Sequence, residues 1–451
     1  MAYIANTPDD VRVMLGAIGL DSLDQLFDMI PAEYRLRRPL EIPGALSELE
    51  LTTHVGALAA RNQGADSRPC FLGGGSYDHF IPAVVDNLAS RGEFYTAYTP
   101  YQAEASQGTL QATFEYQTLI AQLTGMDISN ASLYDGGSAV SEAVLMAMTV
   151  TRRLGRVVVA GSIHPEHVQI LRTNLANLEP EVVVVPPKNG RVEAADLAGA
   201  ITDDTAAVVL AYPNFFGQLE DVEELVKVAK AKGSLAIVSV DPISLGLLRR
   251  PGSYGADIVV GEGQGLGNPL AYGGPYLGIL ACREEFVRKM PGRVVGETVD
   301  RHGKRCFVLT LQTREQHIRR EKATSNICTN QGLLALRASI YLAAVGPTGL
   351  RKVAELSTRK AHYAAERLAE VSGLSIALPG PFFKEFVVRS EKDPVAVLAE
   401  VGRQGYHGGI ALGRWFPEMA DSILVAVTEK RTKAEIDGLA EAFRVAIETV
   451  G

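Results

Sequence analysis

The chain has 451 residues, a hydrophobic content of 47% and a formal net charge of −8 at pH 7. This length exceeds what one ordinary hydrophobic core needs, so we expect two domains and an extension. The acidic balance, with no compensating basic stripe, argues against a nucleic-acid-binding protein. No apolar run reaches the roughly 18 residues of a membrane span, and the N-terminus lacks the pattern of a secretory signal.

Cysteine and histidine residues are not spaced like metal ligands. No CxxC pair is present, and His164 and His167 lack an accompanying set of ligands, so the sequence predicts no zinc site. Scattered cysteines in a long chain are typical of reduced thiols in a cytoplasmic protein. The four cysteines are Cys70, Cys282, Cys306 and Cys328.

Residues 1–65 are expected to form a helical N-terminal arm. Thr7, followed by Pro8 and two aspartates, is a typical helix start, and apolar residues then recur at helical spacing. The arm has no core of its own, so we expect it to wrap around another surface.

Residues 66–345 are expected to form a large α/β domain. Valine-rich runs without alternation predict strands that are buried on both faces, as in a parallel or mixed sheet covered by helices. Ligands of such sheets lie beyond the carboxyl ends of the strands, where His164, Asn214 and Asp241 are placed. The predicted strands are Val157–Ala160, Val182–Val185, Ala206–Tyr212, Leu235–Val240, Asp257–Val260 and Leu277–Cys282.

A helix start at Asp135-Gly136-Gly137-Ser138 precedes these strands. Backbone N–H groups at such a start, together with the hydroxyl of Ser138, suit an anion. A plain Ser N-cap is the alternative interpretation, and this motif alone leaves both open.

Asp241 ends a buried strand, and a second short strand follows it. This layout resembles that of fold-type-I pyridoxal 5'-phosphate (PLP) enzymes. In those enzymes an Asp at this strand end holds the pyridine nitrogen, and a Lys after the next strand forms the Schiff base. Here no lysine lies between Lys232 and Lys289, and Gly265 stands about where that lysine is expected. Glycine supplies no amine, so we do not expect an independently active PLP enzyme; Asp241 capping the following turn is the simpler alternative.

Residues 346–451 are expected to form a smaller C-terminal α+β domain, as in fold-type-I enzymes. Before it, Gly292–Lys304 is predicted to be a loop, and residues 313–330 form a dense polar run that suggests a pocket wall or an interface. In the small domain we expect helices over Gly349–Val371, Val395–Gln404 and Lys433–Val450, and strands over Glu385–Val388 and Ser422–Thr428.

Several segments together carry a resemblance to one known family: residues 71–79, 95–102, 106–111, 134–139, 265–276 and 320–329. They resemble the P-protein of the glycine cleavage system, glycine dehydrogenase (decarboxylating), in its two-subunit bacterial form. The similarity extends along the whole chain, both to subunit 1, which lacks the PLP lysine, and equally to the N-terminal half of the fused form.

The resemblance implies an α/β protein of the aspartate-aminotransferase-like fold type I, with a mostly parallel seven-stranded sheet in the large domain. It also implies that a second subunit binds PLP, that none is bound covalently to this chain, and that the two subunits form an α2β2 heterotetramer. Such a complex decarboxylates glycine, releases CO2 and passes the aminomethyl group to the lipoyl arm of H-protein.

Fold-type-I active sites lie at a dimer interface, so the resemblance implies that loops of this chain complete the partner's site. Sealing of the interface is an equally favoured role, because interfaces are also enriched in tyrosine. The candidates are Ser76, Tyr77, His79, Tyr98, Tyr101, Thr324 and Asn326, and a vestigial cofactor pocket would contain Gly137, Ser138 and Asp241. One alternative function is a non-catalytic scaffold or regulatory paralogue. Another is an autonomous PLP transferase such as a cysteine desulfurase, which needs a Schiff-base lysine.

Overall fold

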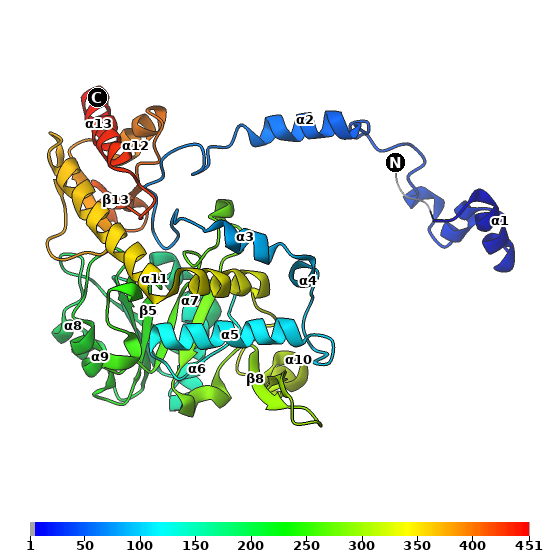
Figure 1. Cartoon of the computed structure of the whole chain (residues 1–451), viewed down its shortest axis with the longest axis horizontal. Coiled ribbons are helices and arrows are strands. Elements are labelled where there is room, and N and C mark those ends of the chain that lie inside the picture. The colour runs from blue at the N-terminus through cyan, green and yellow to red at the C-terminus, as the bar shows by residue number, and fades with distance from the viewer. Residues whose placement is uncertain (1–4, 451) are drawn as a thin grey trace. The chain divides into compact units, whose positions relative to one another are not determined.

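The computed structural model describes residues 5–450, so residues 1–4 of the predicted arm and residue 451 of the predicted small domain lie outside the described part. By their internal contacts the residues form two compact units, Met1–Gln63 and Gly64–Gly451. Figure 1 labels the main helices and several of the strands of these units.

The first unit is a run of short helices, as predicted. These are α1 (Pro8–Ala17), η1 (Leu23–Phe27), η2 (Ala32–Tyr34) and α2 (Glu48–Ala59). Thr7 and Asp10 form a reciprocal capping box at the start of α1, which confirms the predicted helix start. Among residues 5–63 only Leu15 is buried, and large side chains such as Met29 and Tyr34 are exposed. A segment with so much exposed apolar surface is suited to pack against another surface.

The second unit is organised by a seven-stranded sheet with the strand order β1-β7-β6-β5-β4-β2-β3. The strands are β1 (Ile128–Ser129), β2 (Arg156–Ala160), β3 (Glu181–Val185), β4 (Thr205–Tyr212), β5 (Leu235–Val240), β6 (Ile258–Glu262) and β7 (Gly278–Cys282). Strands β2 to β6 are parallel, and β7 is antiparallel to both of its neighbours. The predicted mostly parallel seven-stranded sheet is therefore confirmed.

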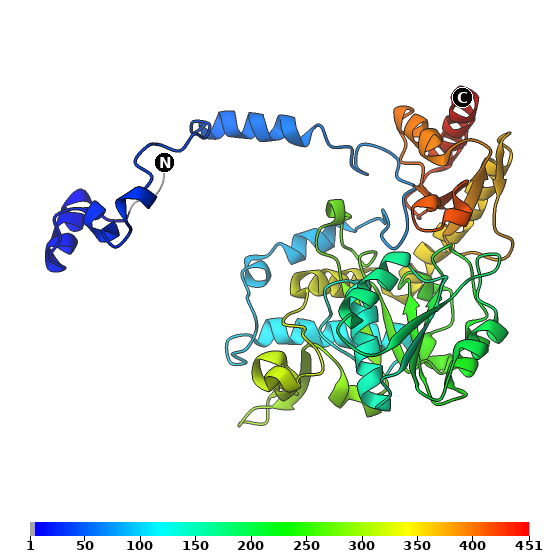
Figure 2. The same cartoon turned by 180° about the vertical axis from the view of Figure 1, so that it is seen from behind.

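Helices cover this sheet. Helix α6 (Gly136–Thr151) lies across β4, β5, β6 and β7, α9 (Val222–Lys230) packs on β4 and β5, and α5 (Gln107–Thr124) packs on β1 and β7. The central strands are buried on both faces, as their valine-rich sequences predict (Figure 2). The other helices of this part are α3 (Ala83–Ala89), α4 (Gly92–Tyr95), α7 (Pro165–Leu175), α8 (Ala194–Ala200) and α10 (Gln316–Arg319).

The prediction of a loop over residues 292–304 is wrong. Most of this segment lies in a hairpin of β8 (Val294–Val299) and β9 (Arg305–Thr310). Val295 and Phe307 of the hairpin are buried together with Leu110 of α5. This contact joins segments far apart in sequence, so the polar composition of the hairpin gave no local signal of it.

A second sheet is antiparallel and has the strand order β10-β11-β13-β12. Its strands are β10 (Leu374–Ile376), β11 (Glu385–Ser390), β12 (Ile410–Ala411) and β13 (Ser422–Ala426), and its helices are α12 (Pro394–Arg403) and α13 (Lys433–Thr449). These agree with the elements that the sequence predicts for the small domain, apart from β10 and β12, which were not predicted.

Helix α11 (Gly332–Ala369) connects the cores beside the two sheets. Gly346 interrupts it with φ +59° and ψ −178°, directly before Pro347. The interruption lies at residues 345 and 346, where the sequence predicts the boundary between the large and the small domain. That boundary stays a prediction. One stretch of α11 is long and apolar enough to cross a membrane by composition alone. Its side chains pack into both cores, so α11 is a core helix.

Candidate functional site

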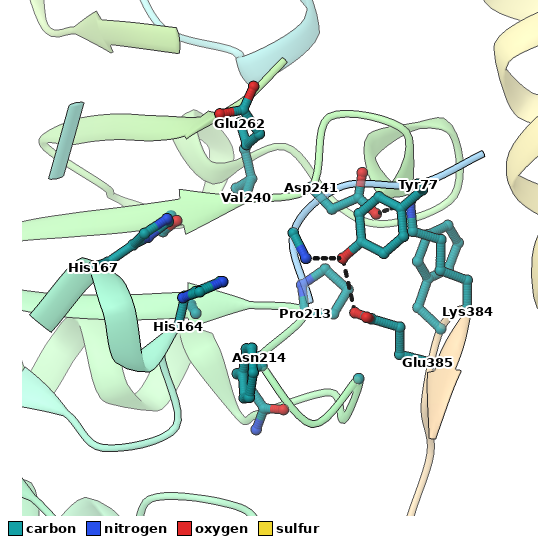
Figure 3. Close-up of a pocket in the computed structure, with 16 residues that line it drawn as sticks. Tyr77, His164, His167, Pro213, Asn214, Val240, Asp241, Glu262, Lys384 and Glu385 are labelled. Atoms are coloured by element: carbon teal, nitrogen blue, oxygen red, sulfur yellow. Dashed lines mark hydrogen bonds and ion pairs between the residues drawn. The ribbon is translucent and has the colours of Figure 1, made fainter. Parts of the chain in front are cut away.

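A cavity of about 70 Å³ lies beyond the carboxyl ends of β4, β5 and β6. Asp241 follows β5, Glu262 ends β6, and His164 caps the start of α7. The second sheet contributes Lys384 and Glu385 to the opposite wall (Figure 3). The cavity is therefore at the predicted edge of the sheet, and it brings together His164, Asn214 and Asp241 as the sequence suggests.

Asp241 is paired within the chain by a lysine that precedes β11. The Nζ atom of Lys384 lies 2.7 Å from Oδ2 of Asp241, and the Lys384 side chain is only 1% exposed. The same Nζ lies 2.9 Å from Nε2 of His79 and 3.3 Å from the centre of the Tyr77 ring, a cation–π contact. An ammonium group only donates hydrogen bonds, so Nε2 of His79 accepts. The ring proton is then on Nδ1, which donates to Glu429 over 2.6 Å.

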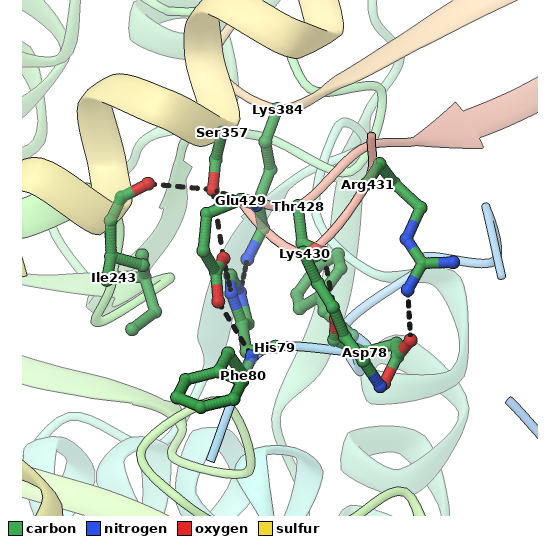
Figure 4. Close-up of polar contacts among 12 residues, drawn as sticks. Asp78, His79, Phe80, Ile243, Ser357, Lys384, Thr428, Glu429, Lys430 and Arg431 are labelled. Carbon is green, nitrogen blue, oxygen red and sulfur yellow. Dashed lines mark hydrogen bonds and ion pairs between the residues drawn. The ribbon is translucent and has the colours of Figure 1, made fainter. Parts of the chain in front are cut away.

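Further polar contacts hold the glycine-rich loop between the two sheets. The hydroxyl of Tyr77 donates to Glu385 over 2.8 Å, and burial raises the pKa of that Glu385 carboxyl to about 7. Asp78 accepts from Lys430 over 2.7 Å and from Arg431 over 2.8 Å (Figure 4). Tyr77 and His79, both predicted site residues, are thus buried within this network.

The start of α6 is also capped from within the chain. Oδ1 of Asp135 accepts from the backbone N–H of Ser138 over 2.7 Å. Oε2 of Glu262 accepts from the backbone N–H of Gly136 over 2.9 Å, and burial raises the pKa of Glu262 to about 7. A Cβ at Gly137 would lie 2.4 Å from the Ile170 side chain. Two carboxyl groups thus stand where an anion would bind, which argues against the anion site. The helix has an N-cap, but the capping residue is Asp135 and not Ser138.

The residues of this cavity do not fit PLP. A volume of about 70 Å³ is well below the roughly 300–1,000 Å³ of small-molecule pockets. Lys384 already neutralises Asp241. The Glu262 carboxyl accepts a hydrogen bond from the Gly136 N–H at the start of α6, where a phosphate group would have to bind. At Gly265 a Cβ would lie 3.1 Å from the His79 ring, so a lysine there would press against that ring. The cavity is filled by the chain's own side chains.

The remaining predicted residues lie in other places. Tyr98 is 93% exposed and lines a second pocket of about 240 Å³, and the hydroxyl of Tyr101 accepts from Arg293 over 3.3 Å beside it. Thr324 is exposed and lines a third pocket of about 260 Å³. Asn326 is exposed and Ser76 is half-buried.

The predicted residues therefore do not form one site within this chain. Tyr77 lines the filled cavity, and His79 contacts the Lys384 that also lines it. Tyr98 lines the second pocket, Tyr101 contacts Arg293 beside it, and Thr324 lies apart from both. Among residues 5–450, no group of three or more His, Cys, Asp or Glu side chains is arranged to hold a metal ion.

Sequence reasoning missed two residues, Lys384 and Arg293. Lys384 stands directly before an apolar strand, and Arg293 lies in the segment that was predicted to be a loop. The only available signal for Lys384 was a charged residue adjoining a buried strand. Nothing in the sequence signalled Arg293, because the residues that it contacts, 101 and 328–330, are far from it along the chain.

Two sheets of this order and arrangement define the fold of type-I PLP enzymes. Glutamate decarboxylase from Lactobacillus brevis shares this fold, with a TM-score of 0.68 over 94% of this chain and 98% of that enzyme. The sequence identity is 12%, so this likeness concerns the fold alone.

The particular family is shown by closer relatives. The family model described as "Glycine cleavage system P-protein" matches residues 1–443. "Probable glycine dehydrogenase (decarboxylating) subunit 1" from Carboxydothermus hydrogenoformans is 54% identical over 441 residues, which covers 98% of this chain and 99% of the relative. A crystal structure of glycine decarboxylase (P-protein) of the glycine cleavage system, in inhibitor-bound form, is 45% identical, with a TM-score of 0.92 over 99% of this chain and all of that one. The chain belongs to the glycine cleavage system P-protein family.

Proposed function

We propose that this chain is subunit 1 of a glycine dehydrogenase (decarboxylating) and that it completes an active site centred on a second subunit. Full-length similarity to subunit 1 relatives supports this role. The observation that carries the proposal is the filled cavity, in which Lys384 neutralises Asp241. In addition, no lysine lies between Lys232 and Lys289 in the sequence, where the Schiff-base lysine is expected. The cofactor that the reaction needs then has to be bound by another chain.

In this proposal the partner, subunit 2, binds PLP through its own lysine in an α2β2 assembly. The complex decarboxylates glycine, releases CO2 and passes the aminomethyl group to the lipoyl arm of H-protein. PLP supplies the electron sink for that chemistry. The residues of this chain would bind and orient glycine and exclude water at the interface.

The exposed surface of the chain supports such a partner. Tyr95, the last residue of α4, and Tyr98 and Tyr101 of the loop that follows are all exposed, and aromatic side chains are enriched where proteins associate. The arm exposes apolar side chains along most of its length, more than a surface facing only water is expected to carry. We infer that subunit 2 covers the tyrosine loop and the arm, with Thr324 and Asn326 as a second wall.

The location of the complex belongs to the same proposal. All four cysteines are free, as expected in the reducing cytoplasm.

Mixing the two subunits tests the proposal. This chain is incubated with PLP alone and then with subunit 2, followed by absorbance spectra and a glycine–bicarbonate exchange assay with lipoylated H-protein. We expect no PLP–lysine band and no exchange from this chain alone, and exchange on mixing. Exchange from this chain alone, or a borohydride-trapped PLP adduct on one of its cavity residues, would contradict the proposal and favour an autonomous PLP transferase.

The alternative is a scaffold or regulatory paralogue that only stabilises its partner. Tyr98→Phe and Tyr101→Phe discriminate between the two in the reconstituted complex. Normal assembly with full activity for both variants would favour the scaffold, whereas normal assembly with impaired turnover would favour a shared active site.

A further inference from the structure

Arg293 is a buried cation without an acidic partner. It is 6% exposed and directly precedes β8. Its Nη1 atom donates to Oγ1 of Thr329 over 3.0 Å and to Oδ1 of Asn330 over 2.9 Å. Its Nη2 atom donates to the carbonyl oxygen of Cys328 over 3.1 Å and to the hydroxyl of Tyr101 over 3.3 Å. Its Nε atom is buried without a hydrogen-bond partner, and within residues 5–450 no carboxylate oxygen lies within 4.0 Å of the guanidinium.

These contacts satisfy hydrogen bonds but leave the charge uncompensated. All four acceptors are neutral, while burial of a charge is unfavourable unless an opposite charge is paired with it. Arg431 provides the contrast, since its side chain is 3% exposed and its guanidinium pairs with Asp78 over 2.8 Å. Arg293 therefore lacks a counter-ion of the kind that Asp78 provides for Arg431.

The second pocket brings Arg293 to a space that a ligand can enter. The pocket is about 240 Å³, and Arg293 is the only charged residue among the described residues that line it. Tyr98, Thr329 and Asn330 add polar groups beside it, and the rest of the lining is mainly apolar. This volume and this single cation suit a small monoanion better than a large or highly charged ligand. The guanidinium already donates both Nη1 and both Nη2 hydrogens, so its Nε–H is the donor left for a charge-assisted hydrogen bond to a carboxylate.

We propose that Arg293 binds the carboxylate of the amino-acid substrate, glycine, and so determines its affinity. The proposal rests on the proposed function, because it places this pocket beside the cofactor that subunit 2 carries. Tyr101, Thr329 and Asn330 hold the guanidinium in position, and the substrate supplies the missing negative charge.

This role predicts a particular kinetic signature. During decarboxylation the negative charge leaves the carboxylate as CO2 forms, so an ion pair to that carboxylate is stronger in the bound substrate than in the transition state. Loss of an interaction of this kind raises KM and raises kcat with it, so that kcat/KM changes much less than KM. A residue that only seals the interface would instead alter assembly.

The test compares Arg293→Gln with the wild-type chain, each reconstituted with subunit 2 and lipoylated H-protein. We expect the glycine KM to rise about ten- to hundredfold, as for the loss of a charge-assisted hydrogen bond, with normal assembly by analytical ultracentrifugation. Acetate, a carboxylate without the amine, should compete with glycine in the wild-type complex and inhibit the variant at least about tenfold less well. Arg305→Gln is the matched control, because Arg305 lies on the same hairpin and pairs with Glu297 at the surface over 2.8 Å.

Each outcome decides the matter. An unchanged glycine KM in Arg293→Gln, with normal exchange by the wild type, would overturn this inference alone. Weakened assembly with an unchanged KM at saturating subunit 2 would overturn it as well. That result would indicate that the counter-ion of Arg293 is an acidic side chain of the partner and not the substrate. No exchange from the wild-type mixture would overturn the proposed function and this inference with it. If Arg293→Gln does not fold, Arg293→Lys replaces it; this variant keeps the charge without the planar fork, and an unchanged KM would again overturn the inference.

Discussion

Two pockets of the second unit each contain a buried cation, and they differ in what surrounds it. In the cavity at the sheet edge, Lys384 is paired with Asp241 and bonded to His79. In the pocket beside the tyrosine loop, Arg293 contacts only neutral oxygens. The first arrangement is electrostatically complete within the chain, and the second is not. The difference indicates that the sheet-edge cavity needs no further charge, whereas the pocket beside the tyrosines contains a cation that the proposed substrate would neutralise.

The largest expected effect is on the stability of the folded chain, and it distinguishes Lys384 from Arg293. Lys384→Met leaves Asp241 unpaired in a site where its side chain is 13% exposed. We expect a loss of about 3–5 kcal/mol in the free energy of unfolding, because breaking a buried ion pair strands one charge. Urea denaturation of the full chain measures it.

Two further variants sharpen this comparison. The double variant Asp241→Asn/Lys384→Met should recover part of the loss, since neither charge remains. Arg293→Met should cost about 1 kcal/mol or less, because the lost hydrogen bonds are offset by removal of an uncompensated charge. Equal losses for Lys384→Met and Arg293→Met would remove the distinction between the two pockets.

A pH dependence tests whether the sheet-edge cavity excludes further negative charge. Burial raises the pKa of Glu262 to about 7 from its ordinary value of about 4.5. Between these two values the folded state keeps a proton that the unfolded state has released. The free energy of unfolding therefore falls as pH rises through this window, by about 2–3 kcal/mol from this group, and it is highest below the lower value.

Glu262→Gln should remove that contribution. The fall in the free energy of unfolding between about pH 5 and pH 8 should then be smaller by about 2 kcal/mol than in the wild type. The variant also loses an acceptor for the Gly136 N–H, which lowers stability at every pH without affecting the slope. Identical slopes for the two chains would contradict the burial of a protonated carboxyl in this cavity.

The sequence predicted those features that depend on neighbouring residues. Apolar runs without alternation located β2 to β7, and Thr7 and Asp10 located the start of α1, because burial on both faces and helix capping leave local patterns. The β8–β9 hairpin was missed because its apolar face packs on α5, far away in sequence. Lys384 and Arg293 were missed for the same reason, since each derives its role from partners that only the folded chain brings close. The absence of a lysine near Gly265 was visible in the sequence, but the filling of the cavity was not.

A smaller effect is expected at the edge of the Arg293 pocket. Tyr101→Phe removes one acceptor that lies 3.3 Å from Nη2 of Arg293. We expect the glycine KM of the reconstituted complex to rise about two- to fivefold, as for the loss of one weak hydrogen bond. Tyr34→Phe, on an exposed tyrosine of the arm, is the control and should leave KM unchanged. A Tyr101→Phe complex with wild-type KM would show that this hydroxyl does not support the guanidinium.

The last prediction is that restoring a lysine does not restore a cofactor site. Gly265→Lys would place an amine about where a Schiff base is expected, but its Cβ would lie 3.1 Å from the His79 ring and 3.4 Å from Ile243. Lys384 would still neutralise Asp241, and Glu262 would still occupy the helix start. Borohydride reduction of the variant with PLP, followed by peptide mapping, should therefore yield no adduct at residue 265 beyond the background of surface lysines in the wild type. An adduct at that residue would mean that the cavity opens readily and that the missing lysine alone, rather than the Lys384–Asp241 pair, keeps the cofactor out.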